Sequence, residues 1–234
     1  MTRIWDRFLT EHDKATLGDR EPKRRGFGRR PALLLIDFYR WVFGDRPEPL
    51  LEAKKTWPGS CGLAAWDAIP PTQRLLAAAR EAKMPVIFST GLDDPSVQGW
   101  GGAWRASLEK TRSLEEDDRN RRRYQIIDEL APLPGETVIR KSSPSVFWGT
   151  PLVGHLTHLG VDSLIVAGES TSGCVRASVV DGATYRYKMV VVEECVFDRV
   201  EASHAMNLFD INAKSADVLP LAEVLEYIEN WRLE

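Results

Sequence analysis

Short apolar runs alternate along this chain with longer segments in which apolar residues recur at helical spacing. An apolar run of about four to eight residues between polar residues is typical of a strand buried on both faces of a parallel sheet. Such runs predict strands at residues 31–37, 84–90, 137–141, 163–167, 188–193 and 217–219. Helical spacing predicts helices at residues 66–83, 150–159 and 201–211, after Cys174, and in a last segment that ends near Trp231.

This alternation predicts an α/β fold of three layers, in which a mostly parallel, six-stranded, Rossmann-like sheet has helices on both faces. The length of 234 residues suits one large domain, which we expect over residues 31–234. Residues 1–30 are strongly charged, and we expect an N-terminal arm there. Its Trp5, Phe8 and Leu9 lie at near-helical spacing, which predicts a short amphipathic helix over the domain or a neighbouring subunit.

Three segments fit neither pattern. Residues 38–58 are rich in aromatic residues, proline and charge, and predict a long loop. Residues 91–104 combine glycine with tryptophan and predict an irregular, lid-like loop. Residues 115–123 hold acidic residues followed by basic ones, which we expect to pair with one another in solvent rather than to bind phosphate.

Composition narrows the classes of partner. The net charge of −3 argues against nucleic acid, which usually binds a basic domain. Three cysteines are too few and too unevenly placed for a disulfide framework, and there is no C-x-x-C pair to suggest zinc. No run approaches the roughly 20 apolar residues of a membrane span, and the first residues lack the apolar core of a signal peptide. We therefore expect a cytoplasmic protein with no membrane partner.

Reactive side chains occur at the carboxyl ends of three predicted strands: Asp37, Lys141 and Cys174. Ligands of open parallel sheets bind outside these strand ends, so the three side chains are predicted to share one edge of the sheet. Cys174 also precedes a predicted helix, whose N-terminal N–H groups and dipole would lower the pKa of the thiol. The alternative is that Cys174 is a small buried residue that packs behind a turn, as free cysteines often do.

These three residue types suit the hydrolysis of an amide. A cysteine that attacks an amide carbon needs a base to take its proton and return it to the departing ammonia, and Asp37 can do both. Lys141 would favour both the thiolate and the ionised carboxylate through its opposite charge. Backbone N–H groups around Ser170 and Cys174 would stabilise the oxyanion.

Three motifs, taken together, resemble the isochorismatase-like cysteine hydrolases over about residues 30–220. The motifs are Leu34-Leu35-Ile36-Asp37, Val138-Ile139-Arg140-Lys141 followed by 142–147, and Gly168-Glu169-Ser170-Thr171-Ser172-Gly173-Cys174-Val175. The resemblance implies a catalytic triad of Asp37, Lys141 and Cys174. It also implies a cis peptide bond between Glu169 and Ser170, which would turn the Ser170 N–H into the oxyanion hole.

Further features resemble the N-carbamoylsarcosine amidohydrolase family within that superfamily. They are Trp5-Asp6-Arg7, residues 44–49, Ser60-Cys61-Gly62, residues 66–70, and residues 171–177. The resemblance implies that Thr171 and Arg199 contact the substrate, with Arg199 gripping its carboxylate. A guanidinium suits this role because it can form a two-point fork with a carboxylate. The alternative for Arg199 is a salt bridge with Asp198 or Glu201.

The chain departs from the nicotinamidase branch, whose metal site the resemblance would place between the first two motifs. No histidine lies between His12 and His155, so we expect no metal and no cofactor. His155 and His158 have helical spacing but lack a further ligand, which favours ordinary surface or packing roles. His204 is a candidate for the lining of the pocket.

The sequence thus predicts a metal-independent amidohydrolase that acts on a small N-carbamoyl amino acid such as N-carbamoylsarcosine. One alternative is an amidase for another small acid amide, such as maleamate. Another is a non-catalytic binding protein on the same fold. The resemblance also implies a homo-oligomer, with a tetramer as one expected state.

Overall fold

The computed structural model describes residues 3–18, 23–92 and 114–231. Six strands form one sheet, in the order β3-β2-β1-β4-β5-β6, and every neighbouring pair is parallel. The strands are β1 (Pro31–Ile36), β2 (Val86–Gly91), β3 (Thr137–Lys141), β4 (Ser163–Glu169), β5 (Lys188–Phe197) and β6 (Asp217–Leu219). The predicted three-layer α/β fold is confirmed.

The order of the strands places a switch point between β1 and β4. The chain builds outward from β1 through β2 to β3, then returns to the other side of β1 and continues outward from β4. The loops that leave β1 and β4 therefore diverge, which opens a crevice at the carboxyl ends of these two strands. Ligands of such sheets bind at that position.

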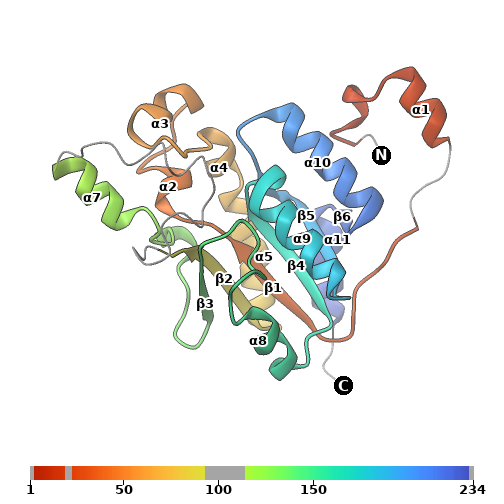
Figure 1. The fold of residues 1–234 in the computed structure, drawn as a ribbon. Coiled ribbons are helices and arrows are strands. Elements are labelled where there is room, and N and C mark those ends of the chain that lie inside the picture. The colour runs from red at the N-terminus through yellow and green to blue at the C-terminus, as the bar shows by residue number, and fades with distance from the viewer. Residues whose placement is uncertain (1–2, 19–22, 93–113, 232–234) are drawn as a thin grey trace.

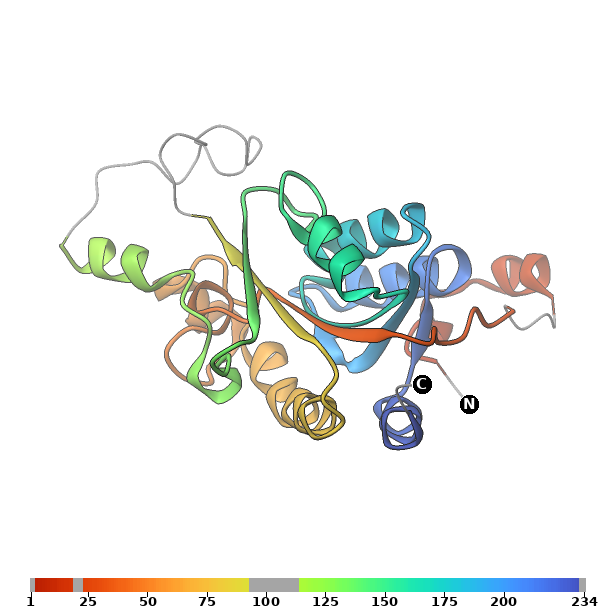
Figure 2. The same cartoon turned by 90° about the horizontal axis from the view of Figure 1, so that it is seen from below.

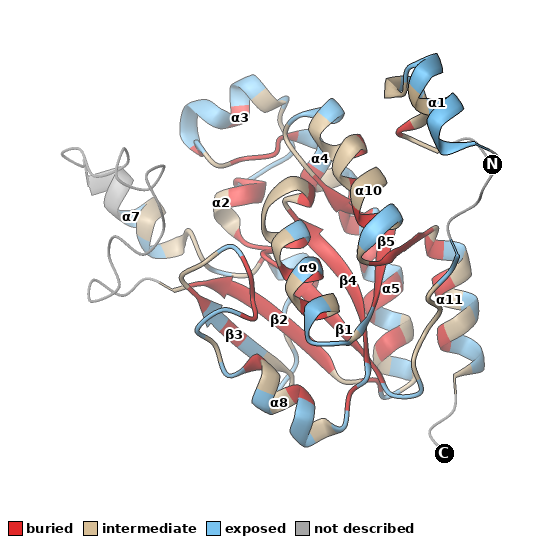
Figure 3. Ribbon diagram, turned by 45° about the vertical axis from the view of Figure 1, so that its right-hand side comes forward, coloured by how far each residue is buried: buried red, intermediate tan, exposed pale blue. Residues whose placement is uncertain are grey.

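Helices cover both faces of the sheet (Figures 1 and 2). One face is covered by α5 (Ile69–Glu81) and α11 (Leu221–Asn230), and the other by α8 (Leu152–Leu159), α9 (Arg176–Thr184) and α10 (Glu201–Lys214). Successive residues of β1 enter opposite layers, as a pleated strand requires. Leu33 and Leu35 pack towards α5, whereas Leu34 and Ile36 pack towards α8 and α9. All six residues of β1 are buried (Figure 3), which explains its unbroken apolar sequence.

The segment 38–58 differs from the predicted loop. It holds two helices, α2 (Arg40–Phe43) and α3 (Leu50–Thr56), and α4 (Leu63–Asp67) precedes α5. Phe43 and Trp57 are buried there at 0% and 1% exposure, so these aromatic residues extend the core beyond the end of the sheet. Tertiary packing thus outweighs the turn-like composition. The predicted lid-like loop at 91–104 lies almost entirely outside the described residues.

The N-terminal arm packs on the core through the three predicted residues, Trp5, Phe8 and Leu9, although they lie in and beside a 3₁₀ turn and not in an α-helix. Trp5 is 5% exposed and its ring lies 6.2 Å from that of Phe209 in α10. A short 3₁₀ turn, η1 (Asp6–Phe8), follows, and α1 (Glu11–Leu17) buries no residue. Trp5 therefore anchors the arm before its helix begins.

The mixed charge run forms much of α7 (Leu114–Arg122), and η3 (Asp128–Leu130) comes after it. Arg122 pairs with Asp118 in the same helix and also with Asp45. The pairing is thus only partly internal to the run. No helix among the described ranges is long and apolar enough to cross a bilayer.

Candidate active site

Asp37 follows β1 directly and is completely buried. Its φ of 60° lies in the left-handed region, which aspartate tolerates better than most residues. Its backbone N–H donates to the Ser89 carbonyl at 3.2 Å, and the Ser89 hydroxyl donates to Asp37 Oδ1 at 2.9 Å. The neighbouring strand β2 therefore fixes both the backbone and the carboxylate.

Lys141 ends β3 and reaches across β2 to the same place. Its Nζ lies 2.7 Å from Asp37 Oδ2 and 3.3 Å from the sulfur of Cys174. It also donates to the Ser143 carbonyl at 3.2 Å. The side chain is 5% exposed. Burial alone would lower the pKa of Lys141, but attraction to Asp37 and Cys174 outweighs it and raises that pKa. The amine thus stays charged between its two partners.

Cys174 lies in a five-residue π-helical turn, η4 (Thr171–Val175), between β4 and α9. The turn can approach β1 because residue 168 is glycine. Gly168 has a φ of 132°, and a Cβ there would collide with the Ile36 carbonyl oxygen. The structure thus brings Asp37, Lys141 and Cys174 together from three separate strand ends. The peptide bond between Glu169 and Ser170 is cis.

The expectation that the pKa of the Cys174 thiol is lowered is wrong. Burial raises this pKa, and the negative charge of Asp37 raises it further. Lys141 opposes the shift without cancelling it, and Glu169 adds to it. The sequence argument considered only the helix dipole, whose effect is small beside the loss of water around a buried anion. A proton acceptor is therefore needed before this sulfur can attack.

A cavity of about 390 Å³ opens beside Cys174. Its wall is largely apolar, with a few polar groups. The lining residues are Tyr39, Trp41, Val42, Pro58, Gly59, Pro144, Glu169, Ser170, Gly173, Cys174 and Arg199. A mainly apolar wall with few polar groups is typical of a site for a small molecule. Of the three clustered side chains, Cys174 lines this cavity.

Glu169 and Arg199 form a second ion pair on the cavity wall. Arg199 Nη1 donates to Glu169 Oε1 at 2.7 Å, and Arg199 Nη2 donates to the Gly59 carbonyl. Neither predicted salt-bridge partner of Arg199, Asp198 or Glu201, makes this contact. Burial raises the pKa of Glu169, and the Arg199 charge opposes that shift. The guanidinium has five N–H groups, so this pairing leaves donors for a ligand.

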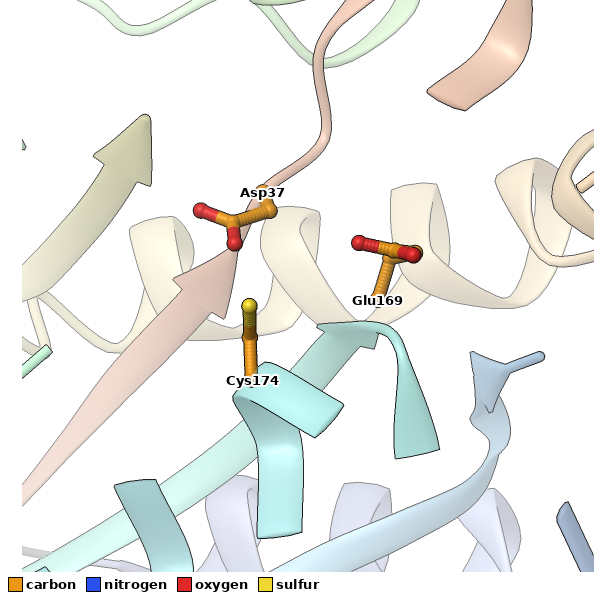
Figure 4. A group of neighbouring side chains, drawn as sticks. All are labelled: Asp37, Glu169 and Cys174. Atoms are coloured by element: carbon orange, nitrogen blue, oxygen red, sulfur yellow. The ribbon is translucent and has the colours of Figure 1, made fainter. Parts of the chain in front are cut away.

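Glu169 is the residue that sequence reasoning missed as a functional candidate. Figure 4 shows the side chains of Asp37 and Glu169 close to the Cys174 sulfur, and the ligand atoms of the three lie within 4.8 Å of one another. The predicted strand stops at residue 167 and gave no such signal, but the burial of Glu169 at the end of β4 marks it as functional, because buried charges need partners. Its partner, Arg199, lies 30 residues away.

Thr171 is not among the residues that line this cavity, and its predicted contact with substrate stays a prediction. It is fully buried, and its hydroxyl donates to the Phe197 carbonyl at 3.2 Å and lies 2.8 Å from His204 Nδ1. Ser172 is held by Asp198, which accepts from its N–H at 2.8 Å and from its hydroxyl at 2.6 Å. These contacts attach the turn of Cys174 to β5 and α10. His204 therefore supports the turn rather than lining the cavity.

Asp37, Glu169 and Cys174 have the spacing of a possible metal site. Two of the three already have a fixed cation, since Lys141 pairs with Asp37 and Arg199 pairs with Glu169. A divalent ion would have to compete with both, so this set of donors does not favour a metal. His155 Nε2 lies 2.9 Å from the Thr137 hydroxyl, which is a packing role.

Comparisons with known proteins identify a family for this chain. Residues 31–223 match the family model described as the isochorismatase domain. The chain is 34% identical over 212 residues to maleamate amidohydrolase of Pseudomonas putida, across 89% of this chain and 91% of that protein. It is also 34% identical over 214 residues to N-carbamoylsarcosine amidase of Arthrobacter sp, across 88% of this chain and 74% of that protein.

Solved structures with low sequence identity share the fold. A cysteine hydrolase from Pseudomonas syringae pv. phaseolicola superimposes with a TM-score of 0.74 at 21% identity, covering 92% of this chain and 100% of that one. An N-carbamoylsarcosine amidase from Thermoplasma acidophilum has a TM-score of 0.59 at 23% identity, covering 82% and 96%.

Proposed function

The chain belongs to the isochorismatase family, and we propose that it is a cysteine-dependent amide hydrolase. Its substrate in this proposal is a small N-carbamoyl amino acid such as N-carbamoylsarcosine. One observation carries the proposal: a thiol faces the cavity, with an enclosed ammonium group 3.3 Å from its sulfur and an enclosed carboxylate within 4.8 Å of it. The names of two relatives, an amidase and an amidohydrolase, support the same class of reaction.

In the first proposed step, Cys174 attacks the carbonyl carbon while its proton passes to Asp37. Because the pKa of the thiol is raised, this transfer accompanies attack rather than preceding it. The sulfur bonds to the carbonyl carbon, and the resulting oxyanion is stabilised by the backbone N–H groups of Ser170 and Cys174. The C–N bond to the amide nitrogen then breaks, and Asp37 returns the proton to the departing ammonia.

Water completes the proposed cycle. It attacks the thioester with Asp37 as base and releases a carbamic acid, which loses carbon dioxide to leave the free amine. Lys141 remains charged throughout and balances whichever of its two neighbours carries the negative charge. Enclosure of the lysine makes this balance strong, because the attraction between charges is less screened away from water.

Arg199 is the proposed contact for the carboxylate of the substrate. It lines the cavity, and its side chain is 27% exposed. Glu169 already neutralises part of its charge, so the contact depends on hydrogen bonds from the free N–H groups as much as on charge. Ser170 also lines the cavity and keeps its proposed place in the oxyanion hole.

A liberated-ammonia assay over small amides tests this proposal. N-carbamoylsarcosine, maleamate and an uncharged N-carbamoyl amine of equal size form the panel. Release from a carbamoyl acid, lost in Cys174→Ala, is the expected result. Turnover of maleamate alone would establish the rival amidase, which a relative of equal identity supports. If the protein binds these amides but releases ammonia from none of them, the non-catalytic alternative is favoured.

The role of Arg199 has its own readout in the same assay. Arg199→Ala should reduce the preference for the acid over the uncharged amine, because it removes a contact that only the acid makes. An equal loss on both substrates would remove Arg199 from the proposal. The single domain over residues 31–234 with its N-terminal arm, the cytoplasmic location and the homo-oligomer remain predictions.

A further inference from the structure

Glu169 places a second carboxylate beside the sulfur of Cys174, in addition to Asp37. We propose that Glu169 selects substrates in which the attacked carbon also carries an N–H group on the side opposite the departing nitrogen. The preferred substrate is then a mono-N-substituted ureido acid, R–NH–CO–NH₂, in which R bears the carboxylate. This inference rests on the proposed function and narrows its substrate class.

The position of the carboxylate is the first support. Glu169 ends β4, five residues before Cys174, whereas Asp37 follows the neighbouring strand β1. In Figure 4 the side chains of Asp37 and Glu169 approach the Cys174 sulfur from two different strand ends. All three ligand atoms lie within 4.8 Å of one another. A carbon bonded to that sulfur would thus have both carboxylates nearby.

An unused hydrogen-bond acceptor is the second support. Glu169 Oε1 accepts from Arg199 at 2.7 Å and has a weak contact with the Cys61 thiol at 3.9 Å. Within residues 3–18, 23–92 and 114–231, no group donates to Oε2. The residue is only 5% exposed, and it lines the cavity. Oε2 is not among the fully buried side-chain atoms that lack a partner, so it keeps access to the cavity. A ligand that displaces water from this oxygen must supply a donor, because an unpaired carboxylate oxygen is costly.

The ureido group supplies donors on both sides of its carbonyl carbon. The departing NH₂ faces Asp37, which must protonate it, and the second N–H then points towards Glu169. An N-methyl group at that position would put a hydrocarbon against the carboxylate and leave it unsatisfied. A carboxamide such as maleamate has a carbon there and donates nothing. The charge of Arg199 opposes the rise that burial causes in the pKa of Glu169, and so favours the form of the carboxylate that accepts hydrogen bonds.

Two probes that differ by one methyl group test this selection. N-carbamoylglycine carries the second N–H, and N-carbamoylsarcosine has a methyl group in its place. The wild-type enzyme should favour N-carbamoylglycine by at least about tenfold in kcat/KM, since a lost hydrogen bond to a buried charge has at least this effect. N-carbamoylsarcosine should still be hydrolysed, but as the poorer substrate.

Glu169→Gln should reduce that ratio to near one. The amide oxygen would take the bond from Arg199, so the NH₂ group would face the N–H of the substrate, and two donors cannot pair. Glu193→Gln is the matched control, because Glu193 also pairs with an arginine, Arg3, at 3.3 Å but lies outside the cavity. It should keep the wild-type ratio. Circular dichroism checks that each variant is folded.

The possible outcomes separate this inference from the proposed function. Equal or better turnover of N-carbamoylsarcosine by the wild-type enzyme would overturn the selection and leave the amidase intact. An unchanged ratio in folded Glu169→Gln would likewise remove Glu169 as its cause. If that variant fails to fold, the wild-type ratio alone decides. Absence of ammonia from every amide would overturn the proposed function, and this inference with it.

Discussion

Two ion pairs flank the switch point of the sheet, and they differ in how far water and ligands can reach them. Lys141 and Asp37 lie 2.7 Å apart with side-chain exposures of 5% and 0%. Arg199 and Glu169 also lie 2.7 Å apart, but with exposures of 27% and 6%. The first pair is enclosed behind Cys174, whereas the second forms part of the cavity wall.

The two ion pairs, which differ in enclosure, suit different functions: proton transfer and ligand recognition. In the enclosed pair, Asp37 binds Lys141 and Ser89, and Lys141 binds three acceptors. Such a pair suits proton transfer to a fixed partner. The open pair keeps a free carboxylate oxygen and free guanidinium N–H groups, which suits recognition of variable ligands. A carboxylate paired with a cation thus serves proton transfer in the enclosed pair and substrate recognition in the open pair.

The largest expected effect separates the two carboxylates by activity. Asp37→Asn cannot accept the proton of Cys174, so kcat should fall about 10²–10⁴-fold on every amide substrate. Glu169→Gln should lower turnover of N-carbamoylsarcosine by less than about tenfold, because that substrate has no N–H for it to bind. Steady-state ammonia release measures both. Similar losses in the two variants would mean that the carboxylates share the proton chemistry.

The enclosed pair could be predicted from the sequence, and the open pair could not. Asp37 and Lys141 each end a predicted strand and Cys174 follows one, and parallel strands bring their carboxyl ends to one edge. Arg199, the partner of Glu169, follows β5, and its position depends on how the chain turns there. The spacing of apolar residues does not predict that turn. The predicted apolar run also stops at residue 167, two residues before β4 ends at Glu169.

Burial explains the other differences from expectation. The sequence places Cys174 near a helix start but does not show how much solvent the sulfur loses or that two carboxylates lie beside it. The pKa direction was therefore wrong although the position was right. Similarly, Phe43 and Trp57 gave residues 38–58 the composition of a loop, yet both are core residues. Composition describes a segment alone, whereas burial depends on what packs against it.

A smaller effect should distinguish the pairs by stability. Lys141→Met leaves the enclosed Asp37 without a cation, and loss of one partner from a buried pair costs about 3–5 kcal/mol. Arg199→Met should cost about 1–3 kcal/mol, because Glu169 can take up water or a proton from the cavity. Urea unfolding measures the free energy of unfolding of both variants, provided that its dependence on urea concentration has the wild-type slope. Lys55→Met, which breaks an exposed pair with Glu52, is the control and should change little.

An order opposite to this one would contradict the comparison. If Arg199→Met destabilised the protein more than Lys141→Met, the open pair would be the structural one, and its role in recognition would lose support. Loss of cooperative unfolding in either variant would show as a changed slope. The midpoints would then be compared only between variants that keep the wild-type slope.

The smallest effect concerns the pH at which Cys174 reacts with iodoacetamide. The thiolate is the reactive form, and nearby negative charge disfavours it, so removal of a carboxylate should lower the pKa of Cys174. Asp37 raises that pKa more than Glu169 does. In the wild-type protein the pH midpoint of alkylation should therefore lie above that of a free cysteine. The midpoint should fall most in Asp37→Asn and less in Glu169→Gln.

Cys174→Ser is the control for this measurement, because it reports the background from Cys61 and Cys195, which are buried. A midpoint unchanged in Asp37→Asn would mean that burial alone holds the thiol protonated and that the enclosed carboxylate does not act on the sulfur.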